Sequence, residues 1–267
     1  MPPHVTRHFV DVPQGTIHYA AAGEGDPVLL LHQTPRSWDE YRDVLPLLGR
    51  TRRAIAMDTI GFGDSVPLRP TDDSIEAWSE VVVALLDALA IQRADLVGHH
   101  TGAVIAVEVA GRAPDRVRSV VLSSSPFDKP EARAAEAAGR AVVDDVERRP
   151  DGSHLLELWR IRAAFYPPGN TDLLERFVVD ALKAGPRAAE GHRVVARYDI
   201  QGGVGRIACP ILLLGATADP YAYPALAGLR ARLPNAEVAE IEGGMVPLPD
   251  QLPKEFAAAV ERFLERL

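Results

Sequence analysis

The amino-acid sequence predicts an α/β fold with a mostly parallel central sheet, flanking helices and an all-helical insert. Strand and helix signals alternate in residues 1–126 and again in 201–267, and short connections between them imply right-handed crossovers between parallel strands. Residues 127–200 lack a convincing strand signal and carry helical stretches instead. We therefore expect one α/β core formed by both flanking segments. Residues 127–200, the helical insert, should cap the carboxyl ends of the strands, where open α/β sheets place their ligands.

The first elements are expected to be strands. RHFVDV (7–12) and GTIHYAAAG (15–23) alternate with period two around Pro13-Gln14-Gly15, as the two strands of a hairpin do. The apolar runs at 27–32 and 52–58 suit parallel strands buried on both faces, and a short helix fits between them at 39–48.

The next elements alternate between helix and strand. Ser74 is a suitable N-cap for a helix to about Ala90, because apolar residues recur at three- and four-residue spacing after it. A strand at 94–98, a helix at 102–112 and a strand at 117–125 follow. These elements continue the same parallel sheet.

The helical insert contains four predicted helices, after which the alternation resumes. Proline and glycine residues separate the four helices, which are expected near 130–147, 153–166, 171–184 and 187–198. The elements expected after the insert are a strand at 210–216, a helix near 222–232, a strand at 236–242 and a final helix at 251–266.

Composition excludes several classes of partner. A net charge of −8 argues against nucleic acid and anionic membrane surfaces, which both require a basic face. No apolar run approaches the ~20 residues that span a bilayer, and the first residues do not resemble a secretory signal. The single cysteine, Cys209, cannot form an internal disulfide and is expected to be a small core residue. We expect a cytoplasmic protein with a small-molecule substrate. The sequence leaves the oligomeric state open, a homodimer included.

Five motifs occur in an order and spacing that resemble the α/β-hydrolase superfamily over essentially the whole chain, with its capped, epoxide-hydrolase-like and esterase-like members the most similar. They are LLLHQTPRSW (29–38), MDTIGFGDS (57–65), GHHTG (98–102), LLLGATADP (212–220) and IEGGMVPLPDQLP (241–253). The resemblance implies that the first supplies an oxyanion-hole amide and that Asp58 and Asp64 in the second stabilise a loop. It also implies that GHHTG is the nucleophile elbow, whose family pattern is G-x-S-x-G. The last two motifs would carry the acid, Asp219, and the histidine of a catalytic triad.

Two positions depart from the family pattern. The elbow presents His100 in place of serine, cysteine or aspartate, and Met245 stands where the triad histidine is expected. A shifted alignment restores neither, because the last histidine is His192 and no serine lies between Ser79 and Ser119. The serine mechanism needs a hydroxyl and a base that removes its proton. Serine-hydrolase chemistry is therefore not expected.

The retained Asp219 suggests a different role for His100. An imidazole at the elbow is longer than a hydroxymethyl group, so its outer nitrogen should reach the space of the missing triad histidine, beside Met245. Our hypothesis is that Asp219 orients this relocated imidazole as a general acid/base, a role worth on the order of 10²–10⁴-fold in rate. The amides of Thr101 and of Gln33 or Thr34 would stabilise an oxyanion.

Other readings of the same residues stay open. His100 is a pocket-lining residue if the fold has lost its chemistry, and the protein then only binds a metabolite. His99 and His32 match positions that are usually structural in the family, and the spacing of His32, His99 and His100 matches no metal site. The residues expected to line the pocket are Trp38, Phe127, Trp159, Tyr166, Tyr221 and Met245.

The sequence therefore favours an enzyme that uses no cofactor and acts on a small or medium organic molecule. A lone imidazole suits proton-transfer chemistry such as elimination, isomerisation, cyclisation or retro-aldol-like cleavage. Hydrolysis without serine is the other route: His100 either activates water or forms an acyl-imidazole that water opens.

Overall fold

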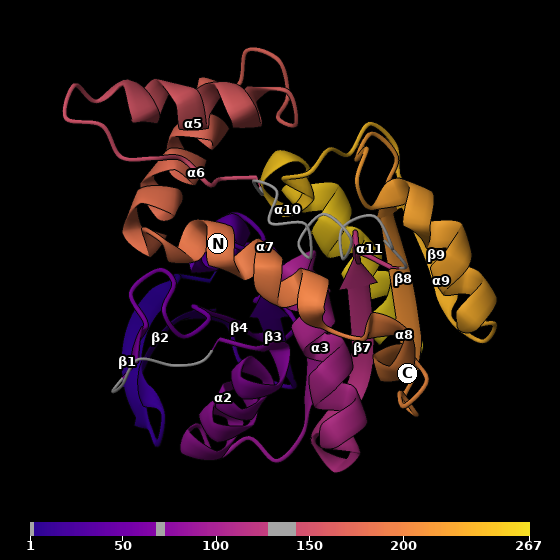
Figure 1. Cartoon of the computed structure of the whole chain (residues 1–267). Helices are drawn as coiled ribbons and strands as arrows, with labels where there is room; N and C mark the ends of the chain where they lie inside the picture. Colours follow the sequence, from indigo (N-terminus) through magenta and orange to yellow (C-terminus); the bar gives the residue numbers. More distant parts are fainter. Residues whose placement is uncertain (1–2, 68–72, 128–142) are drawn as a thin grey trace.

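A computed structural model describes residues 3–67, 73–127 and 143–267 (Figure 1). Its centre is a nine-stranded sheet in the spatial order β1-β2-β4-β3-β6-β7-β8-β9, with β5 (Val66–Pro67) paired to β2. The expected hairpin is confirmed, because β1 (Thr6–Val12) and β2 (Gly15–Ala22) are antiparallel. β2 is also antiparallel to β4 (Arg53–Met57).

In the spatial order of the sheet, the six strands from β4 to β9 run parallel to one another, as expected. They are β4, β3 (Pro27–Leu31), β6 (Ala94–His99), β7 (Val117–Ser123), β8 (Ile211–Ala216) and β9 (Glu237–Ile241). The carboxyl ends of parallel strands meet at one edge of a sheet. Residues that directly follow β6, β7 and β8 are therefore neighbours.

Helices cover both faces of the sheet because its strand residues are apolar on both sides. Leu29 and Leu31 pack with α2 (Ile75–Ala88) and α3 (Thr101–Arg112), whereas Val28 and Leu30 pack with α1 (Leu45–Leu48) and α11 (Pro253–Leu264). The Ser74 hydroxyl accepts a hydrogen bond from the Ala77 amide at 3.1 Å, so the predicted N-cap of α2 is confirmed. The shorter helices are η1 (Trp38–Tyr41), η2 (Pro114–Arg116), α8 (Ile200–Val204), η3 (Tyr223–Ala225), α9 (Leu226–Arg232) and α10 (Leu248–Gln251).

Three of the four helices expected in the helical insert are present between β7 and β8. They are α5 (Ser153–Ala163), α6 (Thr171–Ala184) and α7 (Arg187–Arg197). Most of the helix expected near 130–147 lies outside the described residues, and its last part, 143–147, is turn and irregular structure. Figure 1 shows α5 and α6 beyond the carboxyl ends of the strands, and both contribute to a separate small apolar core.

A buried ionic cluster joins the helical insert to the rest of the fold. The Arg36 side chain is fully buried, and its Nε lies 2.8 Å from Oδ2 of Asp180 on α6. Arg36 also pairs with Asp250 and Asp39, and Arg176 from α6 lies 2.7 Å from Oδ1 of Asp250. We call these five residues the Arg36 cluster. Buried charges are stable only when they are paired, so each member depends on the others.

In the part of the chain that the structure describes, no helix is both long and apolar enough to cross a membrane.

Candidate active site

His100 forms the sharp turn that was expected between β6 and α3. Its φ is +46°, a region that non-glycine residues rarely occupy and that is often found at functional sites. The turn closes because its neighbours have no side chain: a Cβ on Gly102 would collide with the Leu31 carbonyl oxygen, and one on Gly98 with the backbone of Gly102. The elbow thus holds its central side chain at the carboxyl edge of the sheet.

The structure brings His100 and Asp219 together. Nε2 of His100 lies 2.8 Å from Oδ2 of Asp219, whose side chain is fully buried, while the His100 side chain is 15% exposed. The other carboxylate oxygen of Asp219 accepts hydrogen bonds from the amides of Tyr221 at 2.9 Å and Ala222 at 3.0 Å. Burial acts to raise the pKa of Asp219, but His100 and these two amides hold it below its usual range. Asp219 is therefore an anion facing the imidazole.

The contact between the two side chains is oblique. Nε2 and Oδ2 are at hydrogen-bonding distance, yet neither has a partner of acceptable hydrogen-bond geometry among the described residues. Catalytic hydrogen bonds are often poorly aligned without substrate and tighten when it binds. The ring nitrogen of His100 that faces the carboxylate is Nε2, not Nδ1.

The loop that would carry a triad histidine lies beside the elbow and presents Met245. The Ala218 amide donates to the carbonyl of Gly244 at 2.8 Å, and the His99 ring donates to that of Val246 at 2.8 Å. These two contacts flank Met245, which is half-buried. The loop therefore lies against the elbow and carries no histidine.

His99 and His32 are held by hydrogen bonds at both ring nitrogens. Nε2 of His99 donates to Val246, so its Nδ1 accepts from the Ser123 hydroxyl at 3.0 Å, and burial lowers its pKa to about 3. Nδ1 of His32 donates to the Gln33 carbonyl at 2.8 Å, and Nε2 accepts from the Thr59 amide at 2.9 Å. Burial also lowers the pKa of His32. Both rings are neutral and fully engaged, which leaves neither of them a nitrogen for a metal.

The loop after β3 corrects one expectation about the oxyanion hole. The Gln33 amide donates to Oε2 of Glu40 at 2.9 Å, and the Gln33 side chain donates to Oε1 at 2.7 Å. Glu40 is fully buried, and burial raises its pKa to about 8. Because Glu40 takes both donors, the Gln33 amide is not available to a substrate.

Thr34 and Thr101 are the other two residues whose amides were expected to stabilise an oxyanion. The Thr34 amide points at the Thr101 hydroxyl at a long 3.3 Å, and the two hydroxyls are 2.9 Å apart. The Thr101 amide is the first of α3, so it has no acceptor within the helix. The Thr101 hydroxyl is therefore engaged by Thr34.

The six expected pocket residues separate into two groups. Tyr221 donates its amide to Asp219, and its ring lies 4.8 Å from that of Phe165, which follows α5. Met245 lies on the loop that contacts His99 and Ala218. The others contact different parts of the molecule: Trp159 and Tyr166 belong to the apolar core of the helical insert, Phe127 faces Gly228 on α9, and Trp38 lies between Arg7 and His18.

Asp58 stabilises a loop, as the resemblance implied. It accepts hydrogen bonds from the amides of Trp38 at 2.6 Å and Asp64 at 2.8 Å, and from the ring of His18 at 2.8 Å. Asp64 is paired with Arg7 and Lys183. These acids are therefore engaged within the protein.

One residue that sequence reasoning missed lies at the same edge of the sheet. Ser124 directly follows β7, the strand between those that lead to His100 and Asp219. Its hydroxyl is buried and has no hydrogen-bond partner among the described residues. The signal in the sequence was its place after a strand adjacent to the elbow strand.

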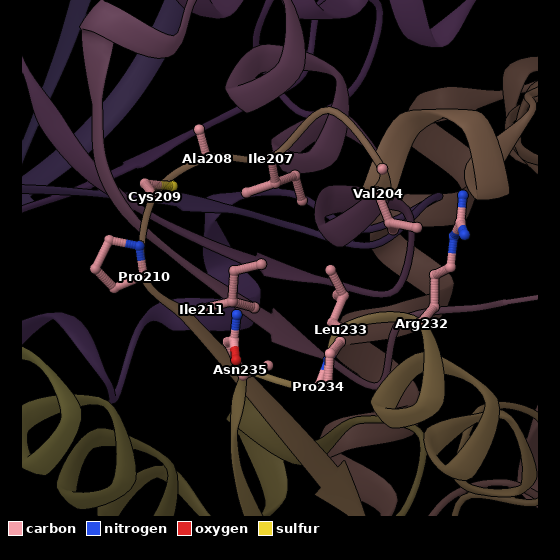
Figure 2. Close-up of a pocket in the computed structure, with 12 residues that line it drawn as sticks. Val204, Ile207, Ala208, Cys209, Pro210, Ile211, Arg232, Leu233, Pro234 and Asn235 are labelled. Atoms are coloured by element: carbon pink, nitrogen blue, oxygen red, sulfur yellow. The ribbon is translucent and has the colours of Figure 1, made fainter.

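A cavity of about 570 Å³ lies elsewhere, at the amino ends of β8 and β9 (Figure 2). Its lining includes Cys209, Pro210, Arg232 and Asn235. Burial raises the pKa of the half-buried Cys209 to about 11, so this thiol is not a nucleophile near neutral pH. This cavity is not the site that His100 and Asp219 form.

Comparisons with known proteins agree with this fold. The model of a family described as alpha/beta hydrolase fold matches residues 26–177. The 2-hydroxymuconate semialdehyde hydrolase of Pseudomonas sp. (strain CF600) is 41% identical over 109 residues, 39% of this chain and 38% of that protein. Haloalkane dehalogenase 2 of Mycobacterium tuberculosis (strain H37Rv) is 34% identical over 140 residues, 52% of this chain and 49% of that protein. The matches thus span less than half of these curated relatives.

The fold is shared with solved structures over nearly the whole chain. A hydrolase from Pseudomonas aeruginosa PA01 superposes with a TM-score of 0.80 at 21% identity, covering 97% of this chain and 98% of that one. At this identity the likeness shows the fold alone.

Proposed function

Because this chain belongs to the α/β-hydrolase fold family, we propose that it is an enzyme in which His100 and Asp219 act as an acid/base pair on a small or medium organic molecule. The observation that carries the proposal is the 2.8 Å separation of Nε2 and Oδ2 at a strained elbow. A buried carboxylate beside an imidazole fixes its tautomer and stabilises the imidazolium that forms during proton transfer.

The roles of the individual groups follow from their positions. With Nε2 toward Asp219, Nδ1 of His100 accepts a proton from the substrate or from water and returns it later in the cycle. The amides of Thr101 and Thr34 face the developing negative charge on a substrate oxygen. Thr34 must release its long contact with the Thr101 hydroxyl to do so.

Proton-transfer chemistry (elimination, isomerisation, cyclisation or retro-aldol-like cleavage) is the reaction class that we favour. It needs a positioned base and an oxyanion site, and it needs no nucleophilic side chain.

Hydrolysis is the second candidate, because the curated relatives named above are a semialdehyde hydrolase and a dehalogenase. In this chain His100 would activate water, or would form an acyl-imidazole that water opens. A protein that binds a metabolite without turning it over is the third candidate.

Substitution of Asp219 by asparagine is expected to slow proton transfer by ~10²-fold, because an amide neither fixes the useful tautomer nor stabilises imidazolium. The measurement is deuterium incorporation at the α-carbon of small ketones and aldehydes in D₂O, followed by NMR, with p-nitrophenyl esters assayed in parallel. Asp115→Asn, an exposed acid at the other end of the sheet, is the matched control.

The outcomes separate the candidates. Exchange that depends on Asp219 supports proton transfer, and ester cleavage with no covalent adduct in mass spectrometry supports water activation. Labelling of the elbow by a fluorophosphonate serine probe, or rates that are equal in Asp219→Asn and wild type, would contradict the assignment.

A further inference from the structure

One buried side-chain oxygen without a polar partner lies beside the acid/base pair, at the same edge of the sheet. Within the described residues, Oγ of Ser124 has no hydrogen-bond partner, whereas Nε2 of His100 and Oδ2 of Asp219, which lack only a partner of acceptable geometry, face each other at 2.8 Å. Native proteins leave few buried polar atoms unsatisfied, and each one calls for an explanation. The three residues follow β6, β7 and β8, which are consecutive in the sheet.

Backbone hydrogen bonds fix Ser124 between the two members of the acid/base pair. The His100 amide donates to the carbonyl of Ser123 at 3.0 Å, and the Ser124 amide donates to that of Leu214 at 2.9 Å. Leu214 belongs to β8, the strand that leads to Asp219. Ser124 is therefore held at the centre of this edge, and the residue is only 4% exposed.

Ser124 carries two local costs that a glycine would avoid. Its φ is +45°, close to the +46° of His100, and a non-glycine residue in this region is strained by about 1–3 kcal/mol. A buried hydroxyl without a partner adds a desolvation penalty of similar size, about 1–3 kcal/mol. The neighbouring Ser125 hydroxyl, by contrast, donates to the Pro126 carbonyl at 3.3 Å.

We propose that Ser124 is a substrate-binding residue of this site, whose hydroxyl hydrogen-bonds an oxygen atom of the substrate while Nδ1 of His100 exchanges the proton. The substrate is accordingly an oxygen-bearing molecule, such as a ketone, an alcohol or a carboxylate, whose oxygen binds Ser124 while its acidic C–H or O–H group lies at Nδ1 of His100. This inference rests on the proposed function and adds a third group to the pair.

The test compares Ser124→Ala and Ser124→Gly with Ser125→Ala as the matched control. Loss of one hydrogen bond to substrate should lower kcat/KM by about three- to tenfold, mainly through KM. The same changes remove an unsatisfied hydroxyl, and in Ser124→Gly also the strain. The melting temperature should therefore rise by a few degrees in Ser124→Ala and further in Ser124→Gly. Ser125→Ala should keep wild-type turnover.

A purely structural serine would behave differently. Its loss would lower the melting temperature and the activity together, and that result would overturn the proposal, as would unchanged kinetics in Ser124→Ala. If His100→Ala is as active as wild type, the acid/base assignment fails by itself, whatever Ser124→Ala shows.

A second readout does not need turnover. Binding of acetone and of butyrate, two small oxygen-bearing probes, is followed by NMR on the His100 ring in wild type and Ser124→Ala. Weaker binding in the variant supports the proposal. Equal affinity, or no binding to wild type, would overturn it.

Discussion

Replacement of His100 by alanine is expected to reduce turnover by on the order of 10²–10⁴-fold, the usual contribution of a positioned acid/base group. The variant removes the ring that faces Asp219 and leaves the backbone turn and the two flanking glycines in place. The measurement is kcat/KM on the substrate found by the exchange or ester assays, with circular dichroism to confirm the fold. His4→Ala, an exposed histidine, is the control.

Two results would contradict the acid/base role of His100. Undiminished turnover in His100→Ala would mean that His100 lines the site without taking part in the reaction. A change in ligand affinity with no turnover in either protein would identify a binding protein.

Replacement of Arg36 by methionine is expected to lower the free energy of unfolding by about 3–5 kcal/mol, the usual result when one partner of a buried ion pair is removed. Asp180 and Asp250 would lose a buried cation, although methionine fills much of the same volume. Burial raises the pKa of Asp250, and Arg36 and Arg176 partly offset this rise. The loss of Arg36 therefore makes the Asp250 carboxylate harder to keep ionised. The measurement is equilibrium unfolding in urea.

Arg42→Met is the matched control for this prediction. Arg42 also pairs with Asp39, but its side chain is 53% exposed, and an exposed pair contributes at most about 1 kcal/mol. If Arg36→Met is no more destabilising than Arg42→Met, the Arg36 cluster does not hold the helical insert to the sheet as we infer.

Much of the fold could be predicted because its signals are local. The Ser74 cap, the period-two hairpin and the apolar runs of β3 and β4 each depend on a few neighbouring residues. The Arg36 cluster could not be predicted, because Asp180 and Asp250, two of the partners of Arg36, lie 144 and 214 positions away from it in the chain. An arginine in a loop is normally exposed, and nothing in the sequence near Arg36 indicates burial.

Part of the active site could also be predicted, because sequence motifs locate its residues at the ends of strands. The motifs that carry His100 and Asp219 follow β6 and β8, which only β7 separates in the parallel sheet, so the topology implies that the two side chains meet. Whether the Gln33 amide is free to bind a substrate depends on the position of Glu40, which no motif specifies. Ser124 was missed because its significance lies in a positive φ and an unpartnered hydroxyl, and sequence shows neither.

The central claim is that Asp219 orients the His100 imidazole with Nδ1 left for the substrate. The most direct measurement is ¹⁵N NMR of the His100 ring in wild type and Asp219→Asn, with the signals assigned from His100→Gln. We predict that the neutral ring of the wild type carries its proton on Nε2 and that this preference weakens in Asp219→Asn. A proton on Nδ1 in the wild type, or the same tautomer in both proteins, would contradict the claim.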